Sequence, residues 1–238
     1  MSQVKADLSN NDSRVLGALF DPESSPSSTI QIIDPSLPGL SQFHPDLLKS
    51  LQAQEVAAIR PLNTPNPSTT SIEKAISSLT HLIEQYPNYP SAWNNRAQAT
   101  RMLVGDDLND QAASSSTLFS DLCQAITLAS PSQPSDPISP FQAKILASSH
   151  SHRGHLLLRL SRSRSMKPAG GEDRNLPGEL RGFDTDRLEE MASRDLFLGG
   201  RYGNGIARQL GVQTNPYAKL CGSIVKESMR RDFEMRTI

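Results

Sequence analysis

The densest group of side chains that could do chemistry lies in HSHRGH, which contains His150, His152 and His155. On a helix, His152 and His155 share a face, but they lack the four-residue spacing of a helical metal pair. No acidic residue stands next to them in the sequence to complete a ligand set. We therefore expect neither a metal site nor a cofactor here.

Other signals of catalysis are equally weak. The glycines of GGRYGNGIA do not follow a strand pattern, so they are expected to end one helix and begin the next rather than to bind a nucleotide. Cys123 and Cys221 have no histidine nearby in sequence and sit in apolar helical patterns. No paired carboxylates, nucleophile elbow or phosphate loop are found. The sequence thus predicts a protein without catalytic residues.

Nucleic acid and membrane are also unfavoured as partners. The net charge is −1, and the basic run SRSRSMK has no aromatic stacking platform, so it is interpreted as a solvated or phosphorylatable loop. The first residues, MSQVKADLSN, contain no apolar signal region, and no apolar run reaches membrane-spanning length. We expect a monomer in the cytoplasm, and a nuclear location is left open.

Composition indicates a modest helical core with long connecting segments, since apolar residues make up 36% of the chain and aromatic residues 5%. Residues 1–45 are predicted to be a mostly disordered tail with a short helix at 13–20. Helices with apolar stripes then follow, and Ser139 with Pro140, and Asp184 or Thr185, are expected to begin two of them. No segment has a convincing strand pattern, so the predicted fold class is all-α.

The spacing of small and apolar residues indicates an internal repeat. Ala75, Leu79, Leu82 and Pro87 are spaced as in the second helix of a 34-residue tetratricopeptide repeat. Trp93 and Ala97 then fall where the first helix of the next repeat carries its aromatic and small residues. Trp93, the only tryptophan, is therefore expected to be largely buried between neighbouring repeats.

The pattern continues through Leu118, Leu122 and Ala125, and then through Gly154, Leu157, Leu188, Ala192 and Asp195. This predicts a domain at 46–238 with three helical hairpins in a right-handed solenoid, at about 46–88, 90–130 and 140–200. A capping helix is expected at about 216–235. Insertions at 61–71, 105–114 and 161–182 are expected to be mobile.

LFDP, WNNRAQA, HRG, IARQL and NPYAKLC together resemble the tetratricopeptide repeat protein 36 family. The resemblance covers residues 13–22 and most of 46–235. It implies a small non-enzymatic protein of three repeats and a capping helix, which binds a protein partner. The implied partners are an Hsp70-type chaperone or an enzyme of tyrosine catabolism.

A tetratricopeptide array lines its concave groove with first helices, so polar residues there are candidates for peptide binding. The predicted groove residues are Asn94, Asn95, Gln98, Arg101, His152, His155 and Arg159, and the predicted structural residues are Trp93, Ala97, Pro87, Gly154 and Tyr217. Of the five residues of a chaperone-type carboxylate clamp, only Asn95 is in place. The function expected is a protein-binding adaptor acting in tyrosine metabolism; the alternative is an Hsp70-type co-chaperone without an intact clamp.

Overall fold

The computed structural model describes residues 31–105, 112–165 and 180–215, together with residues 225, 227, 228 and 230. The helices in these ranges are α2 (Pro45–Ile59), α3 (Thr69–Gln85), α4 (Pro90–Val104), α5 (Ala112–Ala129), α6 (Pro140–Ser165), α7 (Thr185–Arg201) and α8 (Gly205–Thr214), with a 3-10 helix at Arg60–Leu62. The β structure of the described residues is one isolated bridge, between Ile33 and Ile138. The predicted all-α class is confirmed.

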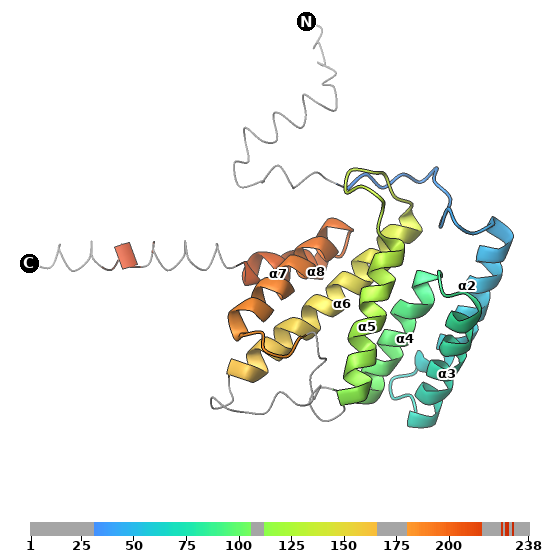
Figure 1. Ribbon diagram of the computed structural model, residues 1–238, viewed down its shortest axis with the longest axis horizontal. Coiled ribbons are helices and arrows are strands. Elements are labelled where there is room, and N and C mark those ends of the chain that lie inside the picture. The colour runs from blue at the N-terminus through green and yellow to red at the C-terminus, as the bar shows by residue number, and fades with distance from the viewer. Residues whose placement is uncertain are drawn as a thin grey trace, which may run out of the picture.

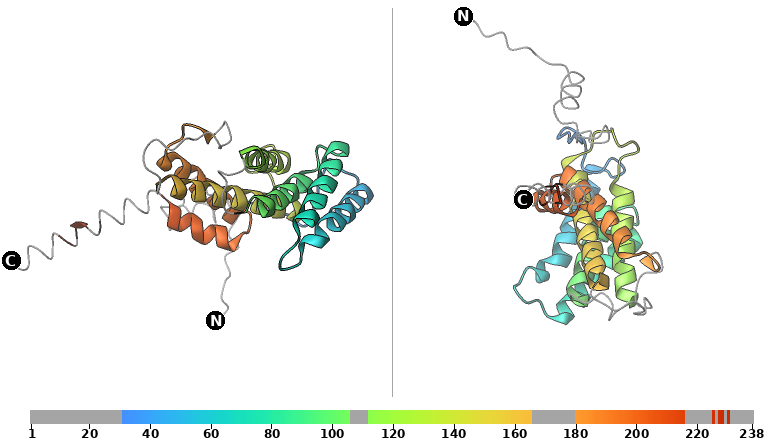
Figure 2. Two further views of the ribbon diagram at one scale, coloured as in Figure 1. Left: turned by 90° about the horizontal axis from the view of Figure 1, so that it is seen from below. Right: turned by 90° about the vertical axis from the view of Figure 1, so that its left-hand side faces the viewer.

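The helices pack in the order in which they occur in the chain (Figure 1). The pairs α2–α3, α4–α5 and α6–α7 are hairpins of helices that follow one another in the chain. Helix α4 also contacts α6, and α2 contacts α4, so the first helices of successive hairpins are neighbours. The two further views show the same progression along the molecule, with α8 beside α7 (Figure 2).

Local capping explains where the later helices begin. The Ser139 hydroxyl accepts from the backbone N–H of Gln142 at 3.1 Å, and the Gln142 side chain accepts from the N–H of Ser139 at 3.1 Å. This reciprocal pair is a capping box at the start of α6. The Asp184 side chain accepts from the N–H of Arg187 at 2.7 Å and begins α7 in the same manner. Both predicted starts are confirmed, with Asp184 rather than Thr185 as the cap of α7.

Two clusters form most of the core. One joins α4 to α8 through Leu118, Leu122, Leu156, Leu157, Leu188 and Leu196, all of which are buried. The other joins the residues before α2 to α3 and the start of α4 through Leu40, Leu51, Leu82, Ile83 and Tyr89. The apolar stripe predicted for α3 is therefore the face that packs on its neighbours.

Trp93 is less buried than the sequence predicts. Its ring packs on the second cluster, but it is only partly buried. The indole N–H donates to the carbonyl oxygen of Pro87 at 2.9 Å, and the guanidinium of Arg96 lies 5.0 Å from the ring centroid. Among the residues that the structure describes, the fully buried aromatic residue is Tyr89, four positions earlier. Tyr89 takes that place because its hydroxyl group finds a buried acceptor in Glu55.

The folded body begins before the predicted boundary at residue 45. Residues 32–34 pair with the segment before α6, where the N–H of Asp34 donates to the carbonyl of Ile138 at 2.9 Å. Ser139 donates its hydroxyl to the carbonyl of Gly39 at 2.6 Å, and Leu40 is fully buried. Residues 31–44 are therefore part of the domain rather than of a disordered tail. This segment is held by hydrogen bonds of its backbone, which produce no periodic pattern of side chains, so the sequence did not predict its place in the domain.

Helix α6 is longer than the sequence predicts. It continues to Ser165, so the first residues of the 161–182 segment, which we expected to be disordered, are helical. Leu160 and Ser161 are buried, and Leu180 after the gap is buried against the same cluster. The basic run that suggested a solvated loop thus begins inside a packed helix, because its first turn lies on core residues.

After α7 the chain turns into α8, which the sequence analysis did not delimit. Asn204 caps it by accepting from the N–H of Ala207 at 2.9 Å. Gly199, at the predicted end of α7, lies inside that helix, and an added Cβ there would be 3.1 Å from the backbone nitrogen of Ser151 in α6 and 3.2 Å from Cβ of Ala207 in α8. The glycine therefore permits close packing of α7 on both α6 and α8. The predicted helix at 13–20, the capping helix at 216–235 with Tyr217, and Cys221 lie outside the described residues.

Candidate functional site

Two arginine–aspartate pairs, each with a buried carboxylate and a partly buried guanidinium, join the hairpins. In the second hairpin, Arg96 of α4 donates Nε and an Nη to the two carboxylate oxygens of Asp121 in α5, at 2.8 and 2.7 Å. Its remaining Nη donates to the hydroxyl of Thr80 in α3 at 3.1 Å. One guanidinium thus ties its own hairpin together and links it to the preceding hairpin.

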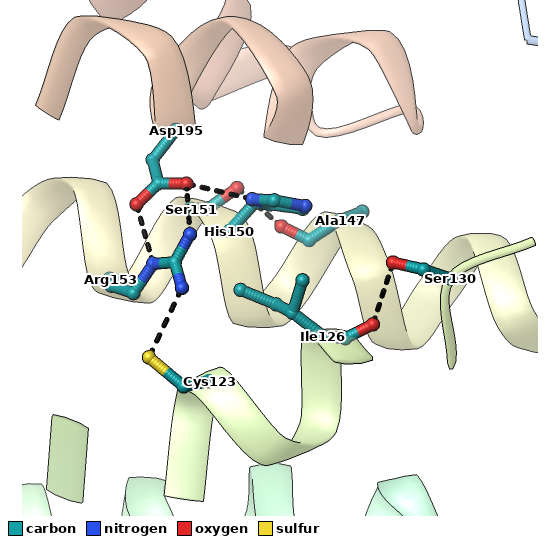
Figure 3. Close-up of polar contacts among 8 residues, drawn as sticks. All are labelled: Cys123, Ile126, Ser130, Ala147, His150, Ser151, Arg153 and Asp195. Carbon is teal, nitrogen blue, oxygen red and sulfur yellow. Dashed lines mark hydrogen bonds and ion pairs between the residues drawn. The ribbon is translucent and has the colours of Figure 1, made fainter. Parts of the chain in front are cut away.

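The third hairpin repeats this arrangement (Figure 3). Arg153 of α6 donates Nε and an Nη to the oxygens of Asp195 in α7, at 2.7 and 2.8 Å. Its other Nη lies 3.2 Å from Sγ of Cys123 in α5. Asp195, which the spacing analysis included only as a repeat position, is therefore a partner of Arg153. Cys123 is partly buried and contacts this guanidinium.

Asp195 has an additional partner, His150. Nδ1 of His150 lies 2.8 Å from an oxygen of Asp195, and the imidazole stacks on Tyr202 with ring centroids 5.8 Å apart. Burial alone would raise the pKa of Asp195, but the hydrogen bonds from Arg153 and His150 outweigh it and hold that pKa below its ordinary value. The first histidine of HSHRGH, His150, is thus part of the polar contacts that join α6 to α7, which we call the polar framework together with the Arg96–Asp121 pair.

The small residues beside the arginines allow the helices to approach. Ala97 follows Arg96 and is fully buried, and Gly154 follows Arg153. A Cβ on Gly154 would lie 3.0 Å from Cγ of Leu196 and 3.1 Å from the carbonyl oxygen of Ala192. The predicted structural roles of these two positions therefore have a specific steric basis.

The two asparagines of α4 are held by neighbouring helices. The side-chain oxygen of Asn94 accepts from the Ser149 hydroxyl of α6 at 3.0 Å, and Asn94 is 5% exposed. The amide of Asn95 donates to a carboxylate oxygen of Glu55 in α2. Asn94 and Asn95 therefore connect α4 to α6 and to α2, and their amides are already engaged.

Glu55 is the buried acid at this junction. It is 5% exposed and also accepts from the hydroxyls of Tyr89 and of Ser91, the latter at 2.5 Å. Burial raises the pKa of Glu55 above its ordinary value, although the three donors and the positive charge of Lys144 act in the opposite direction. Sequence reasoning missed Glu55. A signal was present, since Glu55 continues the buried helical spacing of Leu48 and Leu51.

The remaining predicted groove residues meet where α4 passes α6. The Gln98 amide donates to the Ser148 hydroxyl at 2.9 Å, and Gln98 is exposed. One turn further, Arg101 and His155 both act on His152, whose pKa falls to about 4 because burial and these two positive groups disfavour its charged form. We call Gln98, Arg101, Ser148, His152 and His155 the α4–α6 surface. Arg159 follows on α6 and is partly exposed.

His152 differs from an ordinary exposed histidine. A histidine with the ordinary pKa of 6.5 would gain positive charge near pH 6, but His152 is neutral there because its pKa is about 4. Its Nδ1 is buried and has no hydrogen-bond partner within the described parts of the chain. Across the described residues, no group of three or more His, Cys, Asp or Glu side chains could hold a metal ion. Among the described helices, none is long and apolar enough to cross a lipid bilayer.

The molecule is thus an all-α protein of consecutive helical hairpins, with polar contacts between their first helices. It is 48% identical to the L-tyrosine degradation gene cluster protein hmgX of Aspergillus fumigatus, a similarity that spans 95% of this chain and 94% of the relative. The chain belongs to the family of that protein.

A second relative is more distant. The chain is 28% identical to tetratricopeptide repeat protein 36 of Danio rerio, over 92% of this chain and 91% of that protein. This agrees in part with the resemblance identified from the sequence, although the fungal relative is the more similar of the two. No family model matches the chain. No solved structure matches it either.

Proposed function

We propose that this protein is a non-catalytic adaptor that binds a segment of another protein on the α4–α6 surface. The observation that carries the proposal is the convergence of Gln98, Arg101 and His155 at one place, where Gln98 and His155 are exposed, whereas Asn94 and Asn95 of the same helix bond to neighbouring helices. Amide, guanidinium and imidazole groups in one surface can bond a peptide backbone or an acidic side chain. Met102, 42% exposed and next to Arg101, adds apolar area.

The relative named for an L-tyrosine degradation gene cluster supports a role in tyrosine metabolism. We propose that the bound segment belongs to an enzyme of tyrosine breakdown, and that the adaptor regulates that enzyme. Tetratricopeptide repeat protein 36, the more distant relative, supports the adaptor class through its name. The proposed location is the cytoplasm.

The alternative, an Hsp70-type co-chaperone, has less support from the site. The sequence leaves Asn95 as the one residue of a carboxylate clamp, and its amide donates to Glu55 of the same chain. A ligand carboxylate at this position would have to displace a buried internal carboxylate. Clamp-type recognition of a chaperone terminus is therefore disfavoured.

The test is binding of each purified tyrosine-degrading enzyme to the immobilised full chain. The triple variant Gln98→Ala/Arg101→Ala/His155→Ala should weaken capture of the partner enzyme by at least about tenfold, since loss of a single hot-spot arginine can cost about 2 kcal/mol and tenfold corresponds to about 1.4 kcal/mol. The control is Glu73→Ala/Lys74→Ala, two exposed residues of α3. Equal binding by wild type and the triple variant, or no binding by any enzyme, would contradict the proposal.

A further inference from the structure

A separate pocket lies at the other end of the described domain, between the residues before α2 and α2 itself. Its volume is about 250 Å³. Apolar side chains form most of its wall, namely Pro38, Leu40, Phe43 and Leu48, and two polar side chains of α2, Lys49 and Gln52, stand at the same cavity.

The walls of this pocket are fixed by contacts outside it. The carbonyl of Gly39 accepts from the Ser139 hydroxyl at 2.6 Å, which ties the segment to the start of α6. Phe43 packs edge-to-face on the buried ring of Tyr89, with centroids 5.9 Å apart and planes at 82°. Leu40, within this segment, is fully buried. The pocket is therefore formed before any ligand binds, which lowers the entropic cost of binding.

Size limits what the pocket can hold. Cavities that bind whole small molecules usually measure about 300–1,000 Å³, so a volume of about 250 Å³ suits one large side chain. Buried apolar or aromatic anchors of this kind carry much of the binding energy in protein interfaces. An anchor from a partner segment fits this pocket better than an entire metabolite.

The polar groups beside the pocket indicate which group of the partner lies next to the anchor side chain. Within the part of the chain that the structure describes, the ammonium group of Lys49 has no ion pair and the amide of Gln52 has no hydrogen bond. The neighbouring acid, Asp46, lies 3.6 Å from His44 instead. An ammonium and an amide next to an apolar hollow favour a carboxylate close to a large apolar group.

We infer that this pocket receives a large apolar side chain of a partner protein, with an adjacent acidic side chain of that partner held by Lys49. The inference rests on the proposed adaptor function and supplies the chemistry of part of the partner segment. The pocket is formed by α2 and the segment before it, whereas the α4–α6 surface comes from later helices. The two sites can therefore be tested separately.

The probe is the capped peptide acetyl-Gly-Phe-Glu-Gly-amide, in which the side chain of Glu is the sole carboxylate. Binding to the full chain is followed by NMR through the methyl groups of Leu40 and Leu48. We expect these methyl signals to shift on titration, with an affinity reduced at least about tenfold when Phe is replaced by Ser. Replacement of Glu by Gln should reduce it about twofold to fivefold, as for an exposed ion pair.

Variants of the protein identify the contact. Lys49→Gln should weaken the Phe-Glu peptide about twofold to fivefold and leave the Phe-Gln peptide unchanged. Lys74→Gln, the same change at an exposed lysine of α3, is the matched control and should alter neither. The triple variant of the α4–α6 surface should bind the probe as wild type does, so loss of partner capture with intact probe binding would separate the two proposals.

Three results would overturn the inference. The first is an absence of shifts at Leu40 and Leu48 at millimolar peptide. The second is equal binding of the Phe and Ser peptides. The third is binding that requires an uncapped terminal carboxylate, or that is matched by phenylpropionate alone, because the occupant would then be a chain terminus or a small acid.

Discussion

Arg153 of α6 and Asp195 of α7 form a doubly hydrogen-bonded ion pair at 2.7 and 2.8 Å, in the same arrangement that Arg96 and Asp121 form one hairpin earlier. Each arginine also contacts the preceding hairpin, at Cys123 or at Thr80. The equivalence of these contacts gives the repeat a chemical basis beyond apolar spacing.

The Arg153–Asp195 pair should be a large contributor to stability. Asp195 is 5% exposed, and removal of its partner in Arg153→Ala would leave a buried carboxylate with only His150 nearby. We expect a loss of about 3–5 kcal/mol in the free energy of unfolding, measured by urea denaturation. The control is Arg187→Ala, which breaks an ion pair to Glu190 with side chains 55% and 61% exposed, and should cost about 0–1 kcal/mol. Similar losses of unfolding free energy in the two variants would show that the Arg153–Asp195 pair stabilises the protein no more than an exposed pair does.

Gly154 should not tolerate a methyl group. Gly154→Ala would place Cβ 3.0 Å from Cγ of Leu196 and about as close to α7 backbone, so we expect a cost of about 1–3 kcal/mol in thermal or urea unfolding. Gly205→Ala is the matched control, because no atom lies within 4 Å of its added Cβ. That variant should be neutral or slightly more stable, since alanine favours the helix. A neutral Gly154→Ala would mean that α6 and α7 can separate at little cost.

Glu55 should give a distinct dependence of stability on pH. Its folded pKa is raised above the ordinary value of 4.5, so between these two values the folded state binds more protons than the unfolded state. The contribution of Glu55 to stability therefore falls as pH rises through this window. The free energy of unfolding of Glu55→Gln should therefore increase relative to that of wild type as pH rises above 4.5.

The contribution of Asp195 to stability changes with pH in the opposite direction to that of Glu55. Its folded pKa is lowered, so its contribution is present above its unfolded pKa and is lost as pH falls through the folded value. The difference between wild type and Glu55→Gln cancels this background, because Asp195 is present in both proteins. A difference that does not change with pH would show that Glu55 is not desolvated as the structure indicates.

His152 should titrate at about pH 4, which can be followed through the ring carbon-bound proton signals in NMR spectra. Arg101→Gln removes one of the positive charges that disfavour protonation, so the pKa of His152 should rise in that variant. His152 is neutral near pH 6, so its titration should not change the affinity of the α4–α6 surface for a partner at that pH. A wild-type His152 that titrates near its ordinary value of 6.5 would contradict its burial.

Helix identity was largely determined by local sequence. Ile72, Ala75, Leu79 and Leu82 recur with helical spacing, and these side chains form the buried face of α3. Ser139 and Asp184 begin their helices because a side-chain oxygen can satisfy an N–H group only a few residues away. Information of this kind is contained in a short window, so the all-α class and the hairpin order were predictable.

The polar framework was decided by tertiary structure. Asn95 reaches Glu55 across 40 sequence positions, and Arg153 reaches Asp195 across 42. An asparagine that lines a groove and one that bonds to a buried acid have the same neighbours in sequence. The local sequence therefore cannot show which of these two roles Asn95 has. The same holds for His152, whose low pKa comes from burial and from Arg101 on another helix. The sequence determines which polar groups can form hydrogen bonds. The packing of the helices decides which of these groups bond inside the protein and which lie at the surface, where a partner can reach them.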